Sequence, residues 1–316
     1  MLNTSKVGTV SALTALVGLV QDTGYAFVTP TPATHARVLA RSGGEVARNL
    51  RDVFGWSRPF RDGTVPTTIQ DAMEVAGVLA PAGELWRSTV RLSTLDGGLF
   101  LHSAYPTTAA DSVFFGPDTY RFTQAIERAL DRPVRRAVDV GCGAGPGAIV
   151  VARACRDAEV FGADINDTAL HLAQANAAFA GVQVQFRHSD LMSGLDGSFD
   201  LIVANPPYMA DAAQRAYRDG GGALGADLSM RIVEAALQRL TPGGTLMLYT
   251  GAAIVDGRDP FHDAVAPLLA GWQWQYREMD PDVFGEELEG GAYALVERIA
   301  AVSLTARKPT ASLHGA

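Results

Sequence analysis

The sequence predicts an α/β protein, in which a mostly parallel sheet covered by helices follows a smaller, mainly helical domain. From residue 134 onward, apolar strand-like runs alternate with helix-like segments, a rhythm typical of a parallel sheet with helices on both faces. Before residue 106 this rhythm is absent, and 316 residues are enough for two domains. We therefore expect a helical domain over 1–105, an α/β domain over 106–305 and a flexible tail over 306–316.

The first domain combines helices with one hairpin. Its helix-like segments lie at 11–20, 33–40, 45–53 and 67–79. Strand-like runs follow at 85–92 and 99–102, and Asp96-Gly97 between them is a good hairpin signal. We expect a small, winged-helix-like domain that recognises a substrate or serves as a lid. Arginine is dense over 37–61, which favours a solvated helix surface or, alternatively, a patch that docks an acidic macromolecule.

The second domain contains the alternating elements. Its strand-like runs lie at 134–140, 159–163, 182–187, 199–204, 245–250, 272–279 and 293–304. Its helix-like segments lie at 120–130, 146–155, 168–179, 229–240 and 260–269. Ligands of such sheets bind at the carboxyl ends of the strands, near the point where the strand order reverses.

A glycine-rich turn follows the first of these strands, in the stretch Asp139-Val140-Gly141-Cys142-Gly143-Ala144-Gly145. Such a turn lets a ligand approach the backbone closely. Pro146 stands where a dinucleotide-binding motif has its third glycine, and no Lys-Ser/Thr pair follows as in a phosphate loop. The ligand should therefore lack a pyrophosphate and still press against the backbone. We expect Cys142 to pack behind the turn rather than act as a nucleophile.

Acidic residues follow the next two strands. Asp164 ends the second strand, where a carboxylate commonly accepts hydrogen bonds from both ribose hydroxyls. Asp190 follows the third strand and can accept the exocyclic amino group of an adenine, while Leu191 or Ile165 covers the ring. Either acid alone could cap a helix, but acids at consecutive strand ends beside a glycine turn favour a nucleoside site.

The fourth strand runs into Asn205-Pro206-Pro207-Tyr208. The two prolines donate no backbone hydrogen bonds and have a fixed φ, so the turn is stiff and extended. The Asn205 amide oxygen and the Pro206 carbonyl can hold both hydrogens of a planar –NH2 group, while Tyr208 stacks on its face. A strand-ending turn with a capping asparagine is the simpler alternative. The motif follows the fourth strand, beyond the three other strand ends, and this place favours an acceptor site.

From about residue 111 to 305 the sequence resembles the class I S-adenosylmethionine-dependent methyltransferases, and more narrowly the release-factor glutamine N5-methyltransferase group (the HemK/PrmC-like proteins). The segments that match the group's motifs are Gly141–Gly145, Asp164, Asp190 and Asn205–Tyr208. Gly116–Thr119 is similar to the segment that lies over the cofactor in that group, and its neighbours Phe115 and Tyr120 would form a wall of the site.

The resemblance implies a Rossmann-like sheet of seven strands with the final strand antiparallel, and S-adenosyl-L-methionine as the cofactor. It implies that the residues at the first three strand ends, from Asp139 to Leu191, bind this cofactor. It also implies that Asn205–Tyr208, at the fourth strand end, carry out catalysis with Asn205 close to the cofactor. The acceptor would be a planar amide or amino nitrogen, in a protein glutamine, a nucleobase or a small molecule.

The chain departs from the group in one place. Release-factor enzymes carry Tyr/Phe-Glu-Pro shortly after the Asn-Pro-Pro-Tyr motif, whereas this chain has Tyr217-Arg218-Asp219 followed by Gly220–Gly222, so only the aromatic matches. Protein glutamine is the favoured acceptor. Adenine or guanine in RNA or DNA, a small molecule of secondary metabolism, and an inactive cofactor-binding regulator remain alternatives. The intact motif opposes the last, because binding the cofactor does not require it.

Composition bounds the partners and the compartment. The formal charge is −8, and residues 111–316 carry 17 Lys+Arg against 26 Asp+Glu, which disfavours a nucleic-acid substrate. Two cysteines and no Cys/His cluster predict no metal site and a reducing, cytoplasmic setting. The apolar stretch 7–20 is too short to span a membrane and reads as a core-facing helix. We expect no membrane partner, and the oligomeric state stays open.

Overall fold

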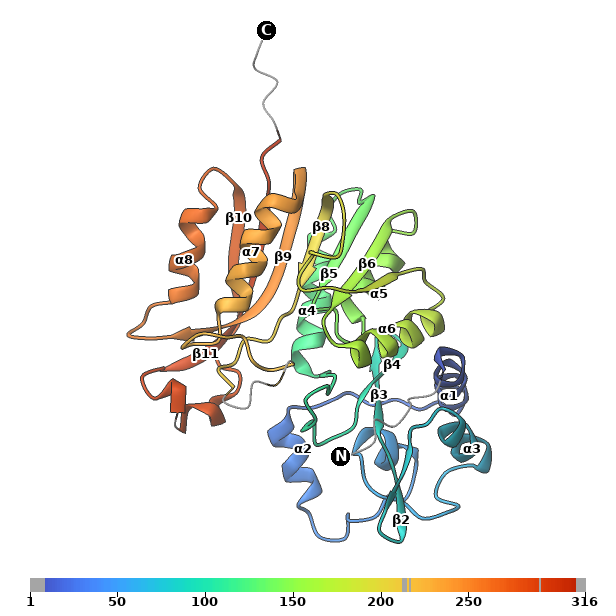
Figure 1. The fold of residues 1–316 in the computed structure, drawn as a ribbon. Coiled ribbons are helices and arrows are strands. Elements are labelled where there is room, and N and C mark those ends of the chain that lie inside the picture. Colours follow the sequence, from blue (N-terminus) through green and yellow to red (C-terminus); the bar gives the residue numbers. More distant parts are fainter. Residues whose placement is uncertain (1–8, 212–214, 216, 290, 311–316) are drawn as a thin grey trace. The chain divides into compact units, whose positions relative to one another are not determined.

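The chain divides into two compact units (Figure 1). The computed structural model describes residues 9–211, 215, 217–289 and 291–310. The first unit contains the chain up to Arg121, with Gly143–Pro146 and Thr168–Gln183. The second contains Phe122–Cys142, Gly147–Asp167 and the chain from Val184 onward. The division is not a single cut in the sequence, because two short segments beyond residue 142 group with the first unit.

The first unit contains helices and two hairpins. Its elements are α1 (Val10–Asp22), α2 (Pro32–Leu39), the π-helix η1 (Arg51–Gly55), α3 (Thr67–Val75), β1 (Leu79–Ala82), β2 (Leu85–Ser88), β3 (Val90–Leu95), β4 (Gly98–Ser103) and most of α6 (Asp167–Ala180). The strands pair antiparallel as β1–β2 and β3–β4. At the β3–β4 turn, Asp96 and Gly97 have φ values of +48° and +74°, as a tight hairpin turn requires. The predicted hairpin is therefore present.

The first helix of this unit faces an apolar core. Its N-cap is Thr9, whose side-chain oxygen accepts a hydrogen bond from the Ala12 N–H at 3.3 Å. Its buried side chains recur at helical spacing: Leu13, Leu16, Val17 and Val20. They share one core with buried side chains of α3 and of the β3–β4 hairpin. The apolar stretch near the start of the sequence is thus a core-facing helix.

The second unit is built on a mixed sheet. Its elements are the main part of α4 (Pro117–Ala129), β5 (Arg136–Val140), α5 (Pro146–Ala154), β6 (Glu159–Asp164), β7 (Gln185–His188), β8 (Phe199–Ala204), α7 (Asp227–Arg239), β9 (Leu240–Ile254), α8 (Pro260–Leu268), β10 (Gln273–Asp280), the 3-10 helices η2 (Gly285–Glu289) and η3 (Gly291–Tyr293), and β11 (Arg298–Arg307).

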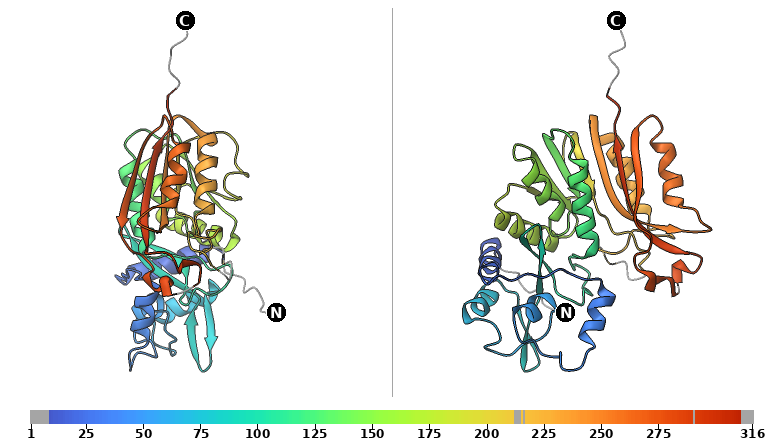
Figure 2. Two further views of the ribbon diagram at one scale, coloured as in Figure 1. Left: turned by 90° about the vertical axis from the view of Figure 1, so that its left-hand side faces the viewer. Right: turned by 180° about the vertical axis from the view of Figure 1, so that it is seen from behind.

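The sheet has seven strands in the order β10-β11-β9-β8-β5-β6-β7. All neighbours are parallel except β11, which runs antiparallel to β9 and β10. Helices α7 and α8 cover one face of the sheet (Figure 2). Four of their side chains join the core of the sheet: Ile232, Val233, Phe261 and Val265. The predicted fold class, a mostly parallel seven-stranded sheet whose last strand is antiparallel, is confirmed.

One predicted helix is absent. Over 45–53 the structure has only the π-helix η1, beginning at Arg51. Side chains take up the backbone N–H groups that a helix would use: Asp52 accepts from the Arg48 N–H and Asn49 accepts from the Asp52 N–H, both at 3.0 Å. Such local side-chain bonds compete with helix formation.

The last strand also differs from the expected range. It begins at Arg298 rather than at 293, after η2 and η3, and it extends to Arg307. Lys308 continues the ordered chain, because its Nζ donates to the carbonyls of Leu237 and Leu240 at 2.9 Å. The strand therefore enters the predicted tail, whose residues 311–316 lie outside the described residues. Within the described ranges, no helix is both long and apolar enough to cross a membrane.

A buried amide in the first unit offers a stability test. Asn176 is 1% exposed; it accepts from the Leu101 N–H at 2.8 Å and donates to the carbonyls of Leu101 at 3.0 Å and Ala144 at 2.9 Å. Asn176→Ala leaves these backbone groups without a partner, so we expect a loss of about 3 kcal/mol in the free energy of unfolding. Urea denaturation measures it. Gln174→Ala, exposed on the same helix, is the control. Equal effects of the two changes would contradict the role of Asn176.

Candidate functional site

Three predicted site residues lie at one level at the edge of the sheet. In the parallel pairing of the central strands, Val140 of β5 is the partner of both Ala163 of β6 and Ala204 of β8. The residues that follow these three in the chain are therefore at a common level: Gly141, Asp164 and Asn205. Since parallel strands point the same way, these three mark the carboxyl edge of the sheet, where ligands of such folds bind.

The third strand end lies beside them. His188 of β7 pairs with Asp164, and the Ser189 N–H donates to the Asp164 carbonyl at 2.9 Å. Leu191 has a φ of +52°, an uncommon conformation for a residue with a side chain. Such backbone is enriched at functional sites, where surrounding structure holds it. Asp190 and Leu191 thus follow the strand in a sharp turn at the same edge.

Asp190 has a partner that the sequence did not predict. Nη2 of Arg231, on α7, lies 3.1 and 3.0 Å from the two carboxylate oxygens of Asp190. The pair is largely exposed. An exposed ion pair contributes little stability, so it can exchange for another donor at low cost. Exposed Ile165, at 55%, is the other apolar side chain expected near a ring at this edge.

The glycine turn has the conformation that its glycines permit. Gly141, Gly143 and Gly145 have φ values of +68°, +52° and +84°. A Cβ added at Gly141 or Gly143 would meet no atom within 4 Å, so the space beside the turn is open. The N–H groups of Gly141 and Cys142 both donate to the Ala163 carbonyl, at 2.8 and 3.0 Å. The turn therefore leaves the sheet at this point with its backbone accessible to a ligand.

Two residues of this region are buried. Cys142 is 4% exposed, and burial first, then the charges of Asp164 and Asp139, raises the pKa of its thiol. A thiol held neutral in this way is no nucleophile, as the sequence analysis expects. Asp139 is 1% exposed, and its Oδ2 accepts from the Ala148 N–H at 2.9 Å, in the first turn of α5.

The second carboxylate oxygen of Asp139 is buried and has no hydrogen-bond partner in the described part of the chain. Burial raises the pKa of this carboxyl to about 7; the nearby charge of Asp164 raises it further and the bond from Ala148 opposes both. Gly147 has no room for a side chain here, because an added Cβ would lie 2.6 Å from Asp139 Oδ2. A buried acceptor without a donor suits an N–H group of a ligand.

The Asn205–Tyr208 turn is packed from beneath. Tyr208 is 6% exposed, and its ring lies over Gly251 of β9. A Cβ added at Gly251 would lie 2.9 Å from Cγ of that ring and closer still to its edge. One added at Gly225 would lie 2.7 Å from the Tyr208 carbonyl carbon. The turn thus occupies space that two glycines leave open.

The segment that departs from the release-factor group supports the same turn. The Met209 N–H donates to the Arg218 carbonyl at 3.0 Å, and the Gly220 N–H donates to the Met209 carbonyl at 2.8 Å. A Cβ added at Gly220 would lie 2.8 Å from the Pro207 carbonyl oxygen. Glycine is therefore required at this position because two backbone segments meet there.

The connection between β10 and β11 reaches the turn as well. The Tyr293 hydroxyl accepts from the Ala210 N–H at 2.7 Å, and the Phe284 ring lies 6.1 Å from that of Tyr208. Arg218 pairs with Glu287 at 2.5 Å. Residues far apart in the sequence thus converge on one turn, which fixes the position of Asn205 and Pro206.

The remaining predicted residues belong to the first unit. Phe115 is 2% exposed there, and its ring stacks on His102 at 5.0 Å. The Tyr120 ring lies 5.5 Å from that of Phe115, and its hydroxyl accepts from the Thr29 N–H at 3.0 Å. Their role as a wall beside the cofactor stays a prediction. In the same unit, Asn176 holds the carbonyl of Ala144 in the glycine turn.

Sequence reasoning missed the residues that support the site: Arg231, Gly225, Gly251, Phe284 and Tyr293. A glycine inside a strand signals a close approach of another group, so Gly251 could have been found. The other four depend on tertiary contacts that have no local signature. Among the described residues, no group of three His, Cys, Asp or Glu side chains could hold a metal ion.

The chain is similar in sequence to proteins that are named methyltransferases. Residues 111–254 match the family model for the methyltransferase small domain. The release factor glutamine methyltransferase of Koribacter versatilis (strain Ellin345) is 34% identical over 183 residues, 54% of this chain and 62% of that protein. The ribosomal protein uL3 glutamine methyltransferase of Neisseria gonorrhoeae is 34% identical over 133 residues, 38% of this chain and 44% of that protein.

The matched part spans less than two thirds of the length of either relative. Among solved structures, a T. thermophilus 16S rRNA N2 methyltransferase in complex with AdoMet and guanosine has a TM-score of 0.46 and 20% identity, over 77% of this chain and 61% of that chain. The predicted resemblance to the release-factor glutamine methyltransferases is confirmed.

The carboxyl of Asp139 makes the stability of the fold depend on pH. Its pKa of about 7 in the folded chain exceeds the ordinary value of 3.8, so the folded chain keeps a proton that the unfolded chain loses. The protonated carboxyl of Asp139 makes its full contribution to the stability of the fold below the ordinary pKa of an aspartate. This contribution is lost as the pH rises through 7. Asp139→Asn removes this loss. Between pH 4 and pH 8, the free energy of unfolding of the variant should therefore rise by on the order of 4 kcal/mol relative to that of the native chain.

Urea unfolding at the two pH values measures this difference. Asp157→Asn, at an exposed position beyond α5, is the control and should parallel the native chain at both. A pH dependence that Asp139→Asn leaves unchanged would mean that the carboxyl is not protonated in the fold.

Proposed function

Because residues 111–254 match the family model for the methyltransferase small domain, we propose that this chain is an S-adenosylmethionine-dependent N-methyltransferase that acts on the side-chain amide of a protein glutamine. One observation carries the proposal. The pairing of β6, β5 and β8 brings Gly141, Asp164 and Asn205 to one level at the carboxyl edge of the sheet. A cofactor cradle and an acceptor-holding turn are then neighbours.

The residues at this edge fit the cofactor. The open backbone at Gly141 and Gly143 admits a ligand in close contact. The unpaired Oδ1 of Asp139 can accept from an ammonium group, which would stabilise the ionised carboxylate. Asp164, whose Oδ1 accepts from the Asn166 N–H at 2.9 Å, would accept from ribose hydroxyls. Asp190, released from its exposed pair with Arg231, can accept from an adenine amino group between Ile165 and Leu191.

When bound, S-adenosylmethionine supplies an electrophilic methyl group. The chain's own task is to present the acceptor nitrogen, which is a poor nucleophile because its lone pair is delocalised. Asn205 Oδ1 and the Pro206 carbonyl accept its two N–H groups, with Tyr208 against the plane of the amide. Holding the nitrogen in line can lower a barrier by about 7–11 kcal/mol in well-oriented systems. The proton leaves as the new bond forms and passes to Asn205 or to water.

Protein glutamine is the acceptor that the comparisons support. Both relatives described above are named for glutamine, one in a release factor and one in ribosomal protein uL3. The segment Tyr217–Gly222 lacks the Glu-Pro of release-factor enzymes, and Gly220 instead lets the segment pack against Pro207. This difference lies beside the acceptor turn, so the protein that carries the glutamine need not be a release factor.

The first unit would then recognise the acceptor protein or close over it, as predicted for residues 1–105. The free cysteines Cys142 and Cys155 accord with a reducing cytoplasm. Radiolabelled methyl transfer from S-adenosylmethionine into a lysate, separated into protein, RNA and small molecules, tests the acceptor class. Label in protein, recovered as N5-methylglutamine after digestion, supports the proposal. Label confined to RNA or to small molecules would replace it.

Two substitutions separate the acceptor turn from the cofactor cradle. Asn205→Ala removes one acceptor for the nitrogen, so we expect the turnover rate to fall roughly 100-fold with little change in cofactor affinity. Asp164→Ala removes a carboxylate partner of the ribose, so we expect the cofactor Kd to rise about 10-fold or more. Single-turnover rates and calorimetric titration measure the two effects. A turnover near the native value for Asn205→Ala would contradict its role.

A third substitution tests the support beneath the turn. Gly251→Ala places a methyl group where the Tyr208 ring lies, so the ring and the turn must shift. A small misplacement of this kind can reduce turnover about 100-fold, while the cofactor Kd should change little. Gly18→Ala, which adds a methyl group to open space in α1, is the control. Native turnover in Gly251→Ala would show that the position of Tyr208 does not matter.

A further inference from the structure

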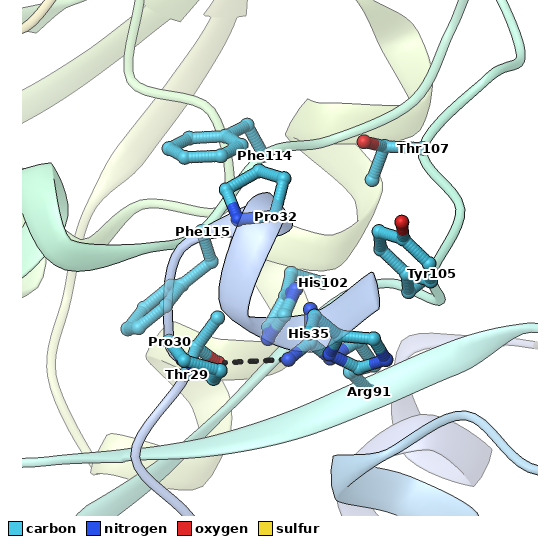
Figure 3. A pocket seen from close by; sticks show the side chains of 10 residues that line it. All are labelled: Thr29, Pro30, Pro32, His35, Arg91, His102, Tyr105, Thr107, Phe114 and Phe115. Atoms are coloured by element: carbon cyan, nitrogen blue, oxygen red, sulfur yellow. Dashed lines mark hydrogen bonds between the residues drawn. The ribbon is translucent and has the colours of Figure 1, made fainter. Parts of the chain in front are cut away.

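A small pocket lies entirely within the first unit. Of the residues assigned to methyl transfer, only Phe115 lines it. Its lining combines basic, hydroxyl and aromatic side chains: Thr29, Pro30, Pro32, His35, Arg91, His102, Tyr105, Thr107, Phe114 and Phe115 (Figure 3). Its enclosed part is about the size of one water molecule. The empty volume of the whole pocket is about 310 Å³, which includes open solvent. The pocket therefore suits the head group of a ligand whose body stays outside.

The charge in this pocket is a buried guanidinium. Arg91, on β3, is 4% exposed. Its Nε donates to the Gly55 carbonyl at 3.1 Å. Its Nη2 donates to the Thr29 hydroxyl at 3.5 Å (Figure 3). Among the side chains that the structure describes, no carboxylate pairs with it. Burying a charge without a counter-ion is costly, so native proteins rarely do it without a ligand.

Further positive charge surrounds this guanidinium. Arg91 and Arg51 both lie over the Phe27 ring, at 5.6 and 5.7 Å from its centroid. Arg58 forms an ion pair with Asp52 at 3.4 Å. Burial lowers the pKa of Arg91 to about 10, so the group remains cationic at neutral pH. The arginines that are dense over 37–61 thus contribute to the positive electrostatic potential at this pocket.

A buried imidazole adjoins the guanidinium. His35, on α2, is fully buried, its ring lies 4.1 Å from that of Tyr105, and its Nε2 is 3.0 Å from the Trp56 carbonyl. Since a carbonyl only accepts, Nε2 carries the hydrogen and Nδ1 holds the lone pair. This Nδ1 is buried and has no hydrogen-bond partner among the described residues. Burial, with Arg91 and Arg58 nearby, lowers the pKa of His35 to about 4.

The opposite side of the pocket is fixed by a chain of neutral groups. His102 Nε2 lies 2.7 Å from the Ser93 hydroxyl, which contacts the Thr29 hydroxyl in turn. Burial and the charge of Arg91 lower the pKa of His102 well below its ordinary value. This wall therefore supplies hydrogen-bonding groups and no negative charge.

From these observations we propose that the pocket binds a carboxylate group, held by Arg91 and His35. The proposal goes beyond methyl transfer and does not depend on it. A guanidinium fork matches the two oxygens of a carboxylate. The narrow enclosed space admits one such oxygen, whereas a phosphate group is bulkier. The bound anion stabilises a protonated His35, which takes a proton from solvent at Nδ1. This Nδ1–H then donates a hydrogen bond to the second carboxylate oxygen.

Titration of the full chain with acetate tests the site, with the His35 ring signal in NMR as the reporter. Acetamide is the uncharged ligand of the same shape. We expect acetate to shift the signal saturably and to bind at least about 10-fold more tightly than acetamide. Equal affinities, or no saturable shift with acetate, would overturn the proposal. Tighter binding of inorganic phosphate than of acetate would overturn the carboxylate assignment.

Proton uptake makes the affinity depend on pH. The groups facing His35 are the cations Arg91 and Arg58, the Tyr105 ring and the Trp56 carbonyl. A bound anion raises the pKa of His35, so acetate should bind more tightly as the pH falls from 8 to 6, where acetate stays ionised. His35→Gln should abolish this dependence. An affinity of the native chain that is constant over this range would overturn the role of His35.

Variants locate the site. Arg91→Lys keeps the charge and loses the fork, so acetate affinity should fall about 10-fold or more. Arg37→Gln, on the same helix as His35 but exposed, should bind as the native chain does. The comparison of acetate with acetamide on the native chain stands even if Arg91→Lys fails to fold. Native affinity in a folded Arg91→Lys would overturn the proposal.

Two peptides distinguish the source of the carboxylate. Acetyl-Gly-Glu-Gly-amide presents a protein side chain, and its glutamine counterpart lacks only the charge. Binding of the glutamate peptide about 10-fold more tightly than acetate would support an acidic side chain of a protein as the ligand. Binding of acetate alone would support a free carboxylic acid. Binding of both peptides with equal affinity would overturn the proposal.

Discussion

The parallel register of β6, β5 and β8 is the constraint on which the candidate site depends. Side chains alternate along a strand, so a slip of one residue would turn every side chain to the other face. The pairing of Val140 with both Ala163 and Ala204 sets the relative heights of the glycine turn, Asp164 and Asn205. Buried apolar residues on these strands hold that register. The chemistry at the edge is thus determined by packing in the middle of the sheet.

Glycines determine where the Asn205–Tyr208 turn can lie. Gly220, Gly225 and Gly251 each leave room that the turn or its neighbour occupies. A stiff Pro-Pro segment cannot adjust its own backbone, so the surrounding structure has to make room for it. The segment that lacks the Glu-Pro of release-factor enzymes contains one of these glycines. Packing at the turn therefore constrains the sequence of this segment.

Much of the fold was predictable because its signals are local. The strand 199–204 coincides with β8, and the helices of the second unit deviate by a few residues at their ends. The absent helix over 45–53 shows the limit, because Asn49 and Asp52 capture backbone N–H groups only in the folded geometry. Residues at the four strand ends were predictable from position. Arg231 was not, because α7 is brought to Asp190 by tertiary structure alone.

The place of β11 between β9 and β10 has a consequence for synthesis. Tyr293 and Phe284 precede this strand and reach back to the turn that follows β8. A chain that emerges from the ribosome amino end first therefore exposes the Asn205–Tyr208 turn long before its supports exist. Contacts of such long sequence separation form late and slowly. The nascent protein should fix this turn in place only as the final strand inserts, so a chain that is stalled before residue 298 carries the motif without its geometry.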